Sequence, residues 1–219
     1  FAMPLDNDSA FGISLIRFAV DDILDTTELI DDQGNVNYDR INLFSTADYG
    51  LTFSYARNLP IEGLRYGVNA KVIRRIIGDF ASSWGFGLDA AIQFENDNNW
   101  KFGLMARDIT TTFNTWTINK EELRPIFNQT NNEIPGNSTE ITLPKAIFGA
   151  SRSFKITNKV DVLASADLVF TFDGRRNVLV KSRFTSIDPQ LGAEFDYEDK
   201  FFFRMGVGNF QRVKDFSFA

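Results

Sequence analysis

Carboxylates are the residues of this chain with the most evident chemistry, and two groups of them are candidates for a site. Asp21 and Asp22 are adjacent, and a run rich in aspartate and asparagine extends from 31 to 39. The chain has no His and no Cys, so it lacks the usual general base of hydrolases and any thiolate nucleophile. Paired carboxylates can act as acid and base, but no nucleophile or pocket motif accompanies Asp21 and Asp22. The sequence therefore predicts a protein that is not an enzyme and has no catalytic residues.

The run at 31–39 could instead bind calcium, which prefers carboxylate and amide oxygens. It lacks EF-hand spacing and has no closing Glu. We expect a solvated loop there, and no metal or cofactor site in the chain. Arg74 and Arg75 beside Asp79 could form a basic recognition site, but the salt-bridged base of a loop is the commoner role of such a cluster.

The long polar segment 109–143 contains an unusual number of large apolar side chains. An exposed loop of this kind either binds a partner or folds back on its own protein, and the sequence leaves both readings open. Within it, Asn119 to Arg124 could form one helical turn, with Asn119 as N-cap and Glu122 at the third helical position. The candidate partner- or cargo-binding residues are Phe113, Trp116, Ile118, Leu123 and Phe127.

These residues must be positioned by strands, because a two-residue period dominates the chain. From Trp84 to Phe94, one side reads Trp, Phe, Leu, Ala, Ile, Phe, and the other reads Gly, Gly, Asp, Ala, Gln. Successive strand side chains point to opposite sides of a sheet, so one side is apolar and the other polar. No apolar run of about 18 residues exists for a membrane helix, whereas barrel strands need only about ten alternating residues each.

The period predicts an all-β protein with one domain over residues 1–219. Long and short connections alternate along it, with 21–45, 75–83, 109–143 and 173–187 as the medium or long ones. This order is typical of an antiparallel up-and-down transmembrane β-barrel, and a soluble β-sandwich is the alternative. The nine predicted strands lie at 10–20, 46–57, 64–74, 84–94, 100–108, 144–154, 160–172, 188–198 and 201–209.

Nine is an odd number, and an open edge in lipid leaves backbone groups unpaired. We therefore expect these residues to be part of a barrel that is incomplete at both ends. Aromatic side chains near strand ends, such as Tyr55, Trp84 and Trp100, would form its interfacial girdles. The net charge of −6 argues against a nucleic-acid partner, which would require a clustered basic surface.

Three segments, 12–26, 75–89 and 102–111, resemble the PorV/PorQ family of outer-membrane barrels from Bacteroidetes. The strongest matches are Ile77-Gly78-Asp79-Phe80-Ala81 and Arg107-Asp108-Ile109-Thr110-Thr111. That family is similar in fold to the long-chain fatty-acid transporter FadL and has about fourteen strands, an even number as in other bacterial barrels. The resemblance implies a FadL-like barrel in the bacterial outer membrane, in contact with its lipid.

The resemblance also implies a role in the type IX secretion system. PorV-like members bind the carboxy-terminal signal domain of secreted cargo, partner the giant translocon barrel, and pass cargo to a cell-surface attachment complex. A FadL-like channel for hydrophobic small molecules is the alternative function. Such a channel should show an apolar groove with a lateral opening or a kinked strand, whereas a cargo carrier should show a loop-lined extracellular cleft.

Overall fold

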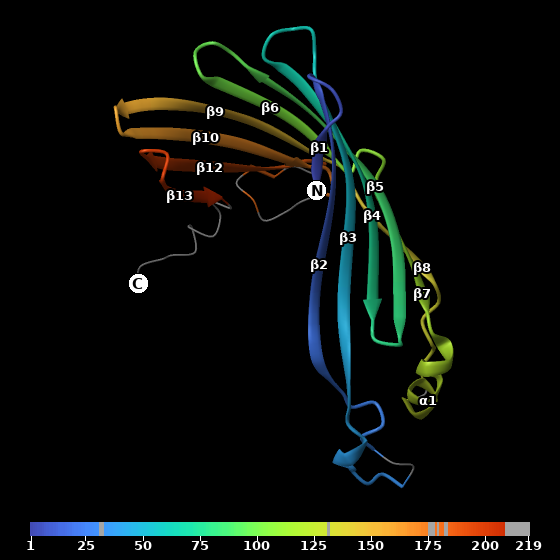
Figure 1. The fold of residues 1–219 in the computed structure, drawn as a ribbon. Coiled ribbons are helices and arrows are strands. Elements are labelled where there is room, and N and C mark those ends of the chain that lie inside the picture. The colour runs from blue at the N-terminus through green and yellow to red at the C-terminus, as the bar shows by residue number, and fades with distance from the viewer. Residues whose placement is uncertain (31–32, 131, 175–177, 179, 182–183, 209–219) are drawn as a thin grey trace.

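The computed structural model describes residues 1–30, 33–130, 132–174, 178, 180–181 and 184–208 as one antiparallel 13-stranded sheet with a single α-helix (Figure 1). Within these residues, no helix is long and apolar enough to cross a membrane. The elements are β1 (Ala2–Pro4), β2 (Ser9–Asp25), η1 (Tyr38–Arg40), β3 (Asn42–Asn58), β4 (Leu64–Ile77), β5 (Ala81–Glu95), β6 (Trp100–Arg107), β7 (Thr112–Ile118), α1 (Lys120–Thr130), β8 (Ser138–Thr142), β9 (Lys145–Thr157), β10 (Val160–Thr171), β11 (Val180–Lys181), β12 (Ser186–Tyr197) and β13 (Phe201–Gly208).

The nine strands predicted from the two-residue period are confirmed as β2, β3, β4, β5, β6, β9, β10, β12 and β13. Two of the predicted connections were wrong. The expected loop 75–83 is a tight turn at 78–80, where Gly78 adopts a φ of 47°. The expected loop 109–143 contains β7, α1 and β8.

The register places the predicted apolar and polar side chains on opposite faces of the sheet. On one face, Phe53 of β3 pairs with Ala70 of β4, which pairs with Leu88 of β5. At the neighbouring positions, on the other face, Thr52 pairs with Lys71, which pairs with Gly87. We call the first side the apolar face and the second the polar face. Apart from Gly85 and Gly87, every tightly buried residue described is polar, and no large apolar side chain among the described residues is buried to the same degree. The buried polar set is Ser9, Ser83, Asp89, Asp108, Thr112, Asn114, Thr171 and Ser186.

The sheet is strongly curved, so that β9, β10, β12 and β13 run across the direction of β2 and β3 (Figure 1). Short connections at 59–63, 96–99, 158–159 and 198–200 lie at one end of the strands. The long connections at 26–41 and 172–185, and the segment containing β7, α1 and β8, lie at the other end. Sequential strands are neighbours, and the path ends with β1 and β2 on one side and β11 and β13 beside β12 on the other. Within the described residues the sheet is therefore open.

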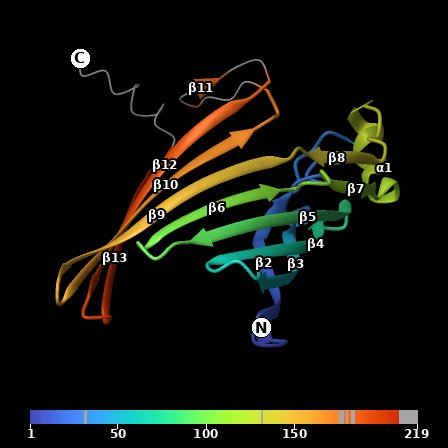
Figure 2. The ribbon, with the colours of Figure 1, turned by 90° about the horizontal axis from the view of Figure 1, so that it is seen from above.

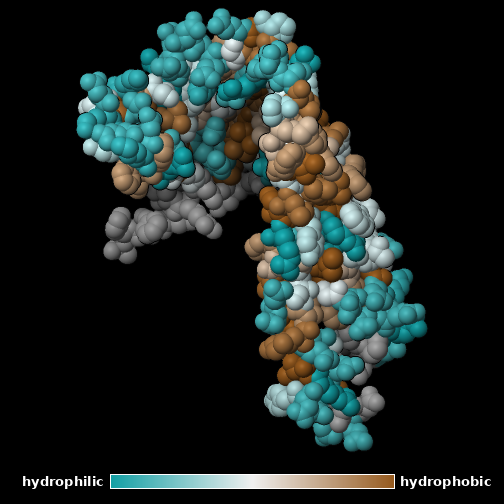
Figure 3. Space-filling model, in the orientation of Figure 1, coloured by the Kyte–Doolittle hydropathy of each residue, from teal (hydrophilic) through white to brown (hydrophobic). Residues whose placement is uncertain are grey.

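Many large apolar side chains are exposed on the surface. In Figure 3 they gather over the upper part of the limb formed by β2 to β5, and polar side chains cover the connections at its two ends. Leu15, Trp84 and Phe86 are each more than half exposed. Exposed apolar surface of this extent marks a face that contacts another protein surface or a membrane.

Candidate functional site

The predicted binding residues lie on or beside a segment that we call the arm, residues 112–142. It consists of β7, α1 and β8 and continues the lines of β6 and β9 (Figure 2). Residues 90–95 of β5 pair with β6, whereas residues 81–86 pair with β7. β6 and β7 therefore act as one long strand, interrupted at 108–111. On the strand opposite, β8 and β9 are separated by Leu143 and Pro144. Pro144 has no N–H to donate to a neighbouring strand.

A buried ion cluster closes the polar face at this interruption. Lys71 Nζ lies 2.7 Å from Asp89 Oδ1 and 2.5 Å from Asp108 Oδ1. The Asp108 backbone N–H donates to Asp89 Oδ1 at 2.9 Å, and the Thr112 hydroxyl donates to Asp108 Oδ1 at 2.6 Å. We call these four residues the Lys71 cluster. Because it joins β4 and β5 to the first residue of β7, it fixes the angle at which the arm leaves the sheet.

The interruption also turns a side chain toward the apolar face. Asp108 and Thr111 adopt positive φ angles of 54° and 62°, which non-glycine residues adopt only rarely. The Ile109 N–H donates to the Leu88 carbonyl at 2.9 Å, and its side chain is exposed. Between β6 and β7 the chain thus leaves the strand pairing with β5. Asp108 and Thr112 lie on the polar face, and Ile109 lies on the apolar face.

Close packing of β7 on β5 depends on two glycines. A Cβ at Gly85 would overlap Asn114 Oδ1 and lie 2.8 Å from the Phe113 carbonyl oxygen, and one at Gly87 would overlap Thr112 Oγ1. These side chains occupy the space that larger residues on β5 would fill. The two glycines therefore allow the arm to lie directly against the sheet.

Gly85→Ala is expected to displace β7 and to destabilise the protein by about 1–3 kcal/mol, the usual cost of overpacking. The measurements are the rate of limited proteolysis within the arm, which should rise, and the midpoint of urea unfolding, which should fall. Gly103→Ala is the matched control, because it lies on the same face of β6 with no atom within 4 Å of an added Cβ. Equal effects of the two substitutions would contradict the close-packing role.

A second polar-face cluster holds Trp116. The guanidinium of Arg75 lies over its ring, 5.3 Å from the centroid, and pairs with Asp48 at 3.1 Å and with Glu140 at 3.3 Å. The Trp116 Nε1–H donates to Glu140 Oε2 at 3.2 Å. The salt-bridged reading of Arg75 is confirmed, although the residue lies within β4 and not at the base of a loop. Arg74 lies on the apolar face, stacked on Trp84.

Helix α1 is attached to the turn at 78–80 through its N-cap. The Asn119 side chain donates to the Asp79 carbonyl at 3.0 Å, and its Oδ1 accepts from the Glu122 N–H at 3.5 Å. The N-cap prediction is confirmed, and the helix is longer than the single turn expected. In Figure 1 the arm extends past the turn between β4 and β5.

The five predicted binding residues do not form one patch. Phe113 pairs with Phe86 on the apolar face, whereas Trp116 and Ile118 pair with Ser83 and Ala81 on the polar face. Leu123 and Phe127 lie on α1, and both are half-buried. Sequence reasoning missed the Lys71 cluster. It placed Asp89 on the polar side and Asp108 at the end of the predicted strand 100–108, but it treated Thr112 as loop.

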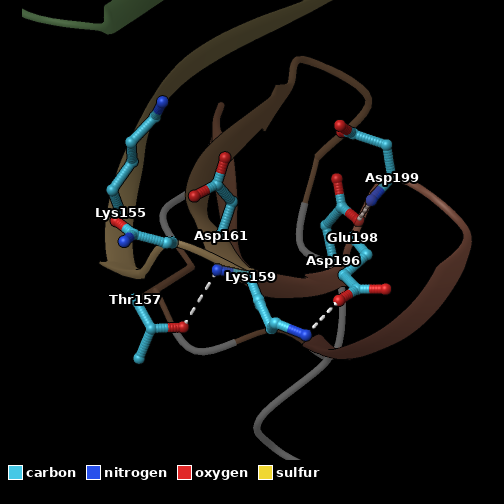
Figure 4. A pocket seen from close by; sticks show the side chains of 8 residues that line it. Lys155, Thr157, Lys159, Asp161, Asp196, Glu198 and Asp199 are labelled. Carbon is cyan, nitrogen blue, oxygen red and sulfur yellow. Dashed lines mark hydrogen bonds and ion pairs between the residues drawn. The ribbon is translucent and has the colours of Figure 1, made fainter.

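A polar hollow of ≈ 210 Å³ lies at the opposite end of the strands (Figure 4). Its lining includes Lys159, whose Nζ lies 2.6 Å from Glu198 Oε1, and Asp196, which accepts from the Asp199 N–H at 2.9 Å. The Lys159–Glu198 ion pair joins the neighbouring turns at 158–159 and 198–200. Among the described residues, no His, Cys, Asp and Glu side chains are grouped in a way that could hold a metal ion. Asp31 and Asp32 of the calcium-like run lie outside the described residues.

The chain is thus an antiparallel all-β protein whose sheet orders polar side chains on one face and exposes apolar ones on the other. No family model matches it, and no curated protein does.

Proposed function

We propose that the chain forms the wall of an outer-membrane β-barrel, with the apolar face against lipid and the polar face toward the interior. The alternation in β5 is the observation that carries this proposal. Trp84, Phe86 and Leu88 are exposed, while Ser83, Gly85, Gly87 and Asp89 between them are buried. Lipid-facing and interior-facing residues alternate in this way in membrane barrels, and burial of one such apolar side chain contributes about 1.5–3 kcal/mol.

The dimensions of the apolar face support the same proposal. Phe94 follows Trp84 by ten residues in β5, which corresponds to about 34 Å along a strand. At the tilt of about 35–45° found in membrane barrels, this length spans a height of about 24–28 Å. The apolar band of outer-membrane barrels is about 25 Å tall. Trp84 and Phe94 therefore lie where the two aromatic girdles are expected.

Closure of the wall requires further strands or a partner edge, because unpaired backbone groups cost several kcal/mol each in lipid. On the edge of β2 that faces away from β3, residues 14–25 have no strand partner among the described residues. This agrees with the expectation that the full barrel contains more strands than these.

Alkaline carbonate extraction tests the membrane assignment. The protein, expressed in a Gram-negative host behind an outer-membrane signal peptide, should remain in the outer-membrane pellet and require detergent for release. Recovery in the carbonate supernatant would contradict the barrel and favour the soluble sandwich.

For this outer-membrane barrel, we propose a non-enzymatic role in type IX secretion, in which the arm binds a translocon partner or the signal domain of cargo. The support is the resemblance of the three segments described above, together with an arm that two ion clusters fix at the end of the long connections. Affinity purification of the full-length barrel from native membranes should recover a giant translocon barrel or signal-domain cargo. Recovery of the barrel with lipid alone would contradict this role.

A FadL-like channel for hydrophobic small molecules is the second candidate, and the interrupted strand favours it. An apolar hollow of ≈ 390 Å³ lies on the apolar face beside the interruption, and Ile109 forms part of its lining. The other lining residues include Phe11, Phe53, Tyr55, Val68 and Leu88. Uptake of a fluorescent fatty acid into vesicles containing the full-length barrel, absent from empty vesicles, would support this function over the first.

A further inference from the structure

The apolar face carries charge of one sign at its paired strand positions. The charged residues there are Arg17, Arg57, Arg74 and Arg152, with no Asp or Glu among the described pairs. The polar face, in contrast, mixes both signs, as in the pairs of Lys71 with Asp89 and Arg204 with Glu194. Since an unpaired charge in a lipid-facing position is costly, the bias requires an explanation.

Three of these arginines, Arg17, Arg74 and Arg152, lie over aromatic rings. Arg74 lies 5.0 Å from the ring centroid of Trp84, and Arg17 lies 5.8 Å from that of Tyr49. At the other end of the strands, Arg152 lies 5.3 Å from Trp100 and 5.0 Å from Phe154. These three arginines therefore occupy the depth of the aromatic girdles, where lipid headgroups begin.

Two of the arginines form one continuous row with their aromatic neighbours. Arg17 pairs with Tyr49, Tyr49 with Arg74, and Arg74 with Trp84, across the adjacent strands β2, β3, β4 and β5. We call these four residues the arginine row. Two strand spacings separate the backbones of Arg17 and Arg74 by about 10 Å, so two long side chains can converge on one anion.

The guanidinium donors of the row are only partly used. Arg74 donates to the Ser83 carbonyl at 3.4 Å and makes no ion pair with any described residue. Arg17 Nε donates to the Tyr49 hydroxyl at 3.3 Å, and its nearest carboxylate oxygen, on Asp21, is 4.0 Å away. Arg75, the next residue along, instead pairs with two carboxylates on the polar face. A guanidinium has five N–H donors, so most of those in the row remain available.

We propose that the arginine row binds the phosphate group of an anionic membrane lipid, in the leaflet nearest the long connections. This inference rests on the proposed membrane location. The planar fork of arginine matches the geometry of a phosphate, and Tyr49 and Trp84 supply the amphipathic rings that pack beside headgroups. The charge is complementary, and the position is the boundary between acyl chains and water.

The test compares dioleoyl phosphatidic acid with dioleoylglycerol, which differ by the phosphate alone. Full-length protein in neutral detergent is incubated with each lipid, and bound lipid is measured by native mass spectrometry. Hydrogen bonds from guanidinium groups to a phosphate are charge-assisted and stronger than neutral ones, so we expect at least about tenfold tighter retention of phosphatidic acid. Arg17→Gln with Arg74→Gln should remove this preference, and Arg17→Lys with Arg74→Lys should keep part of it.

The matched control is Arg65→Gln with Lys101→Gln, which removes two positive charges from the polar face. The side chains of Arg65 and Lys101 are exposed to a degree similar to that of Arg17. The control should leave the preference unchanged. Equal retention of the two lipids, equal losses in both double variants, or displacement of phosphatidic acid by equimolar inorganic phosphate would each overturn the inference. Carbonate extraction of the same protein separates the two proposals, because a membrane-embedded barrel without the preference would contradict the lipid site alone.

Discussion

Leu88→Arg is expected to lower the free energy of unfolding in a lipid bilayer by about 2–4 kcal/mol, the cost of an arginine on the lipid face at the bilayer midplane. Leu88 lies between Trp84 and Phe94 on the apolar face of β5, near the middle of the proposed band. Its side chain is 45% exposed. If that exposure were to water, a surface substitution would change stability by only about 0.5 kcal/mol or less.

The measurement is urea unfolding of the full-length protein in vesicles, followed by the loss of its folded band in cold gel electrophoresis. Thr115→Arg is the matched control, because Thr115 lies on the apolar face of the arm, level with Trp84 at the edge of the band. The depth dependence of the arginine cost predicts a loss of about 0–1 kcal/mol there. Similar small effects at both positions would contradict a lipid-facing surface and favour the sandwich.

The strands could be predicted from the sequence because their signal is local. Alternation over ten or more residues fixes both the element and its two faces, and this held from β2 to β13 for all nine strands. The arm could not be predicted in the same way. β7 reads Thr-Phe-Asn-Thr-Trp-Thr-Ile and β8 reads Ser-Thr-Glu-Ile-Thr, so polar residues dominate both faces and the segments resemble loop.

The Lys71 cluster was beyond prediction for a different reason. Asp89 and Asp108 lie 18 and 37 residues from Lys71 along the chain, and only strand pairing brings the three together. The register across β4 and β5 decides that Lys71 faces Gly87, with Asn69 beside Asp89. The helix cap, in contrast, depends on residues three positions apart, and the sequence was sufficient to place it at Asn119.

The same distinction explains why the five predicted binding residues were dispersed. They were chosen as apolar side chains in a polar segment, which is a property of composition. Whether two of them share a surface depends on the period of the element that contains them. In a strand, Phe113 and Trp116 are an odd number of positions apart, so they must lie on opposite faces.

Lys71→Met is expected to cost about 3–5 kcal/mol of folding free energy, because it leaves Asp89 and Asp108 buried without a cation. Their side chains are 5% and 11% exposed, and that of Lys71 is 16% exposed. Lys101→Met is the matched control, since Lys101 and its partner Glu95 are 39% and 38% exposed. Exposed pairs of that kind contribute about 0–1 kcal/mol.

Adding Asp89→Asn and Asp108→Asn to Lys71→Met should restore most of the lost stability, because the uncompensated charges are then removed while the amide oxygens still accept hydrogen bonds. Hydrogen exchange locates the effect. In Lys71→Met, amide protection should fall in β7, which begins at Thr112 of the cluster, while β10 on the far side of β9 keeps its protection. Equal loss of protection in both strands would mean that the cluster stabilises the sheet as a whole and does not hold the arm in place.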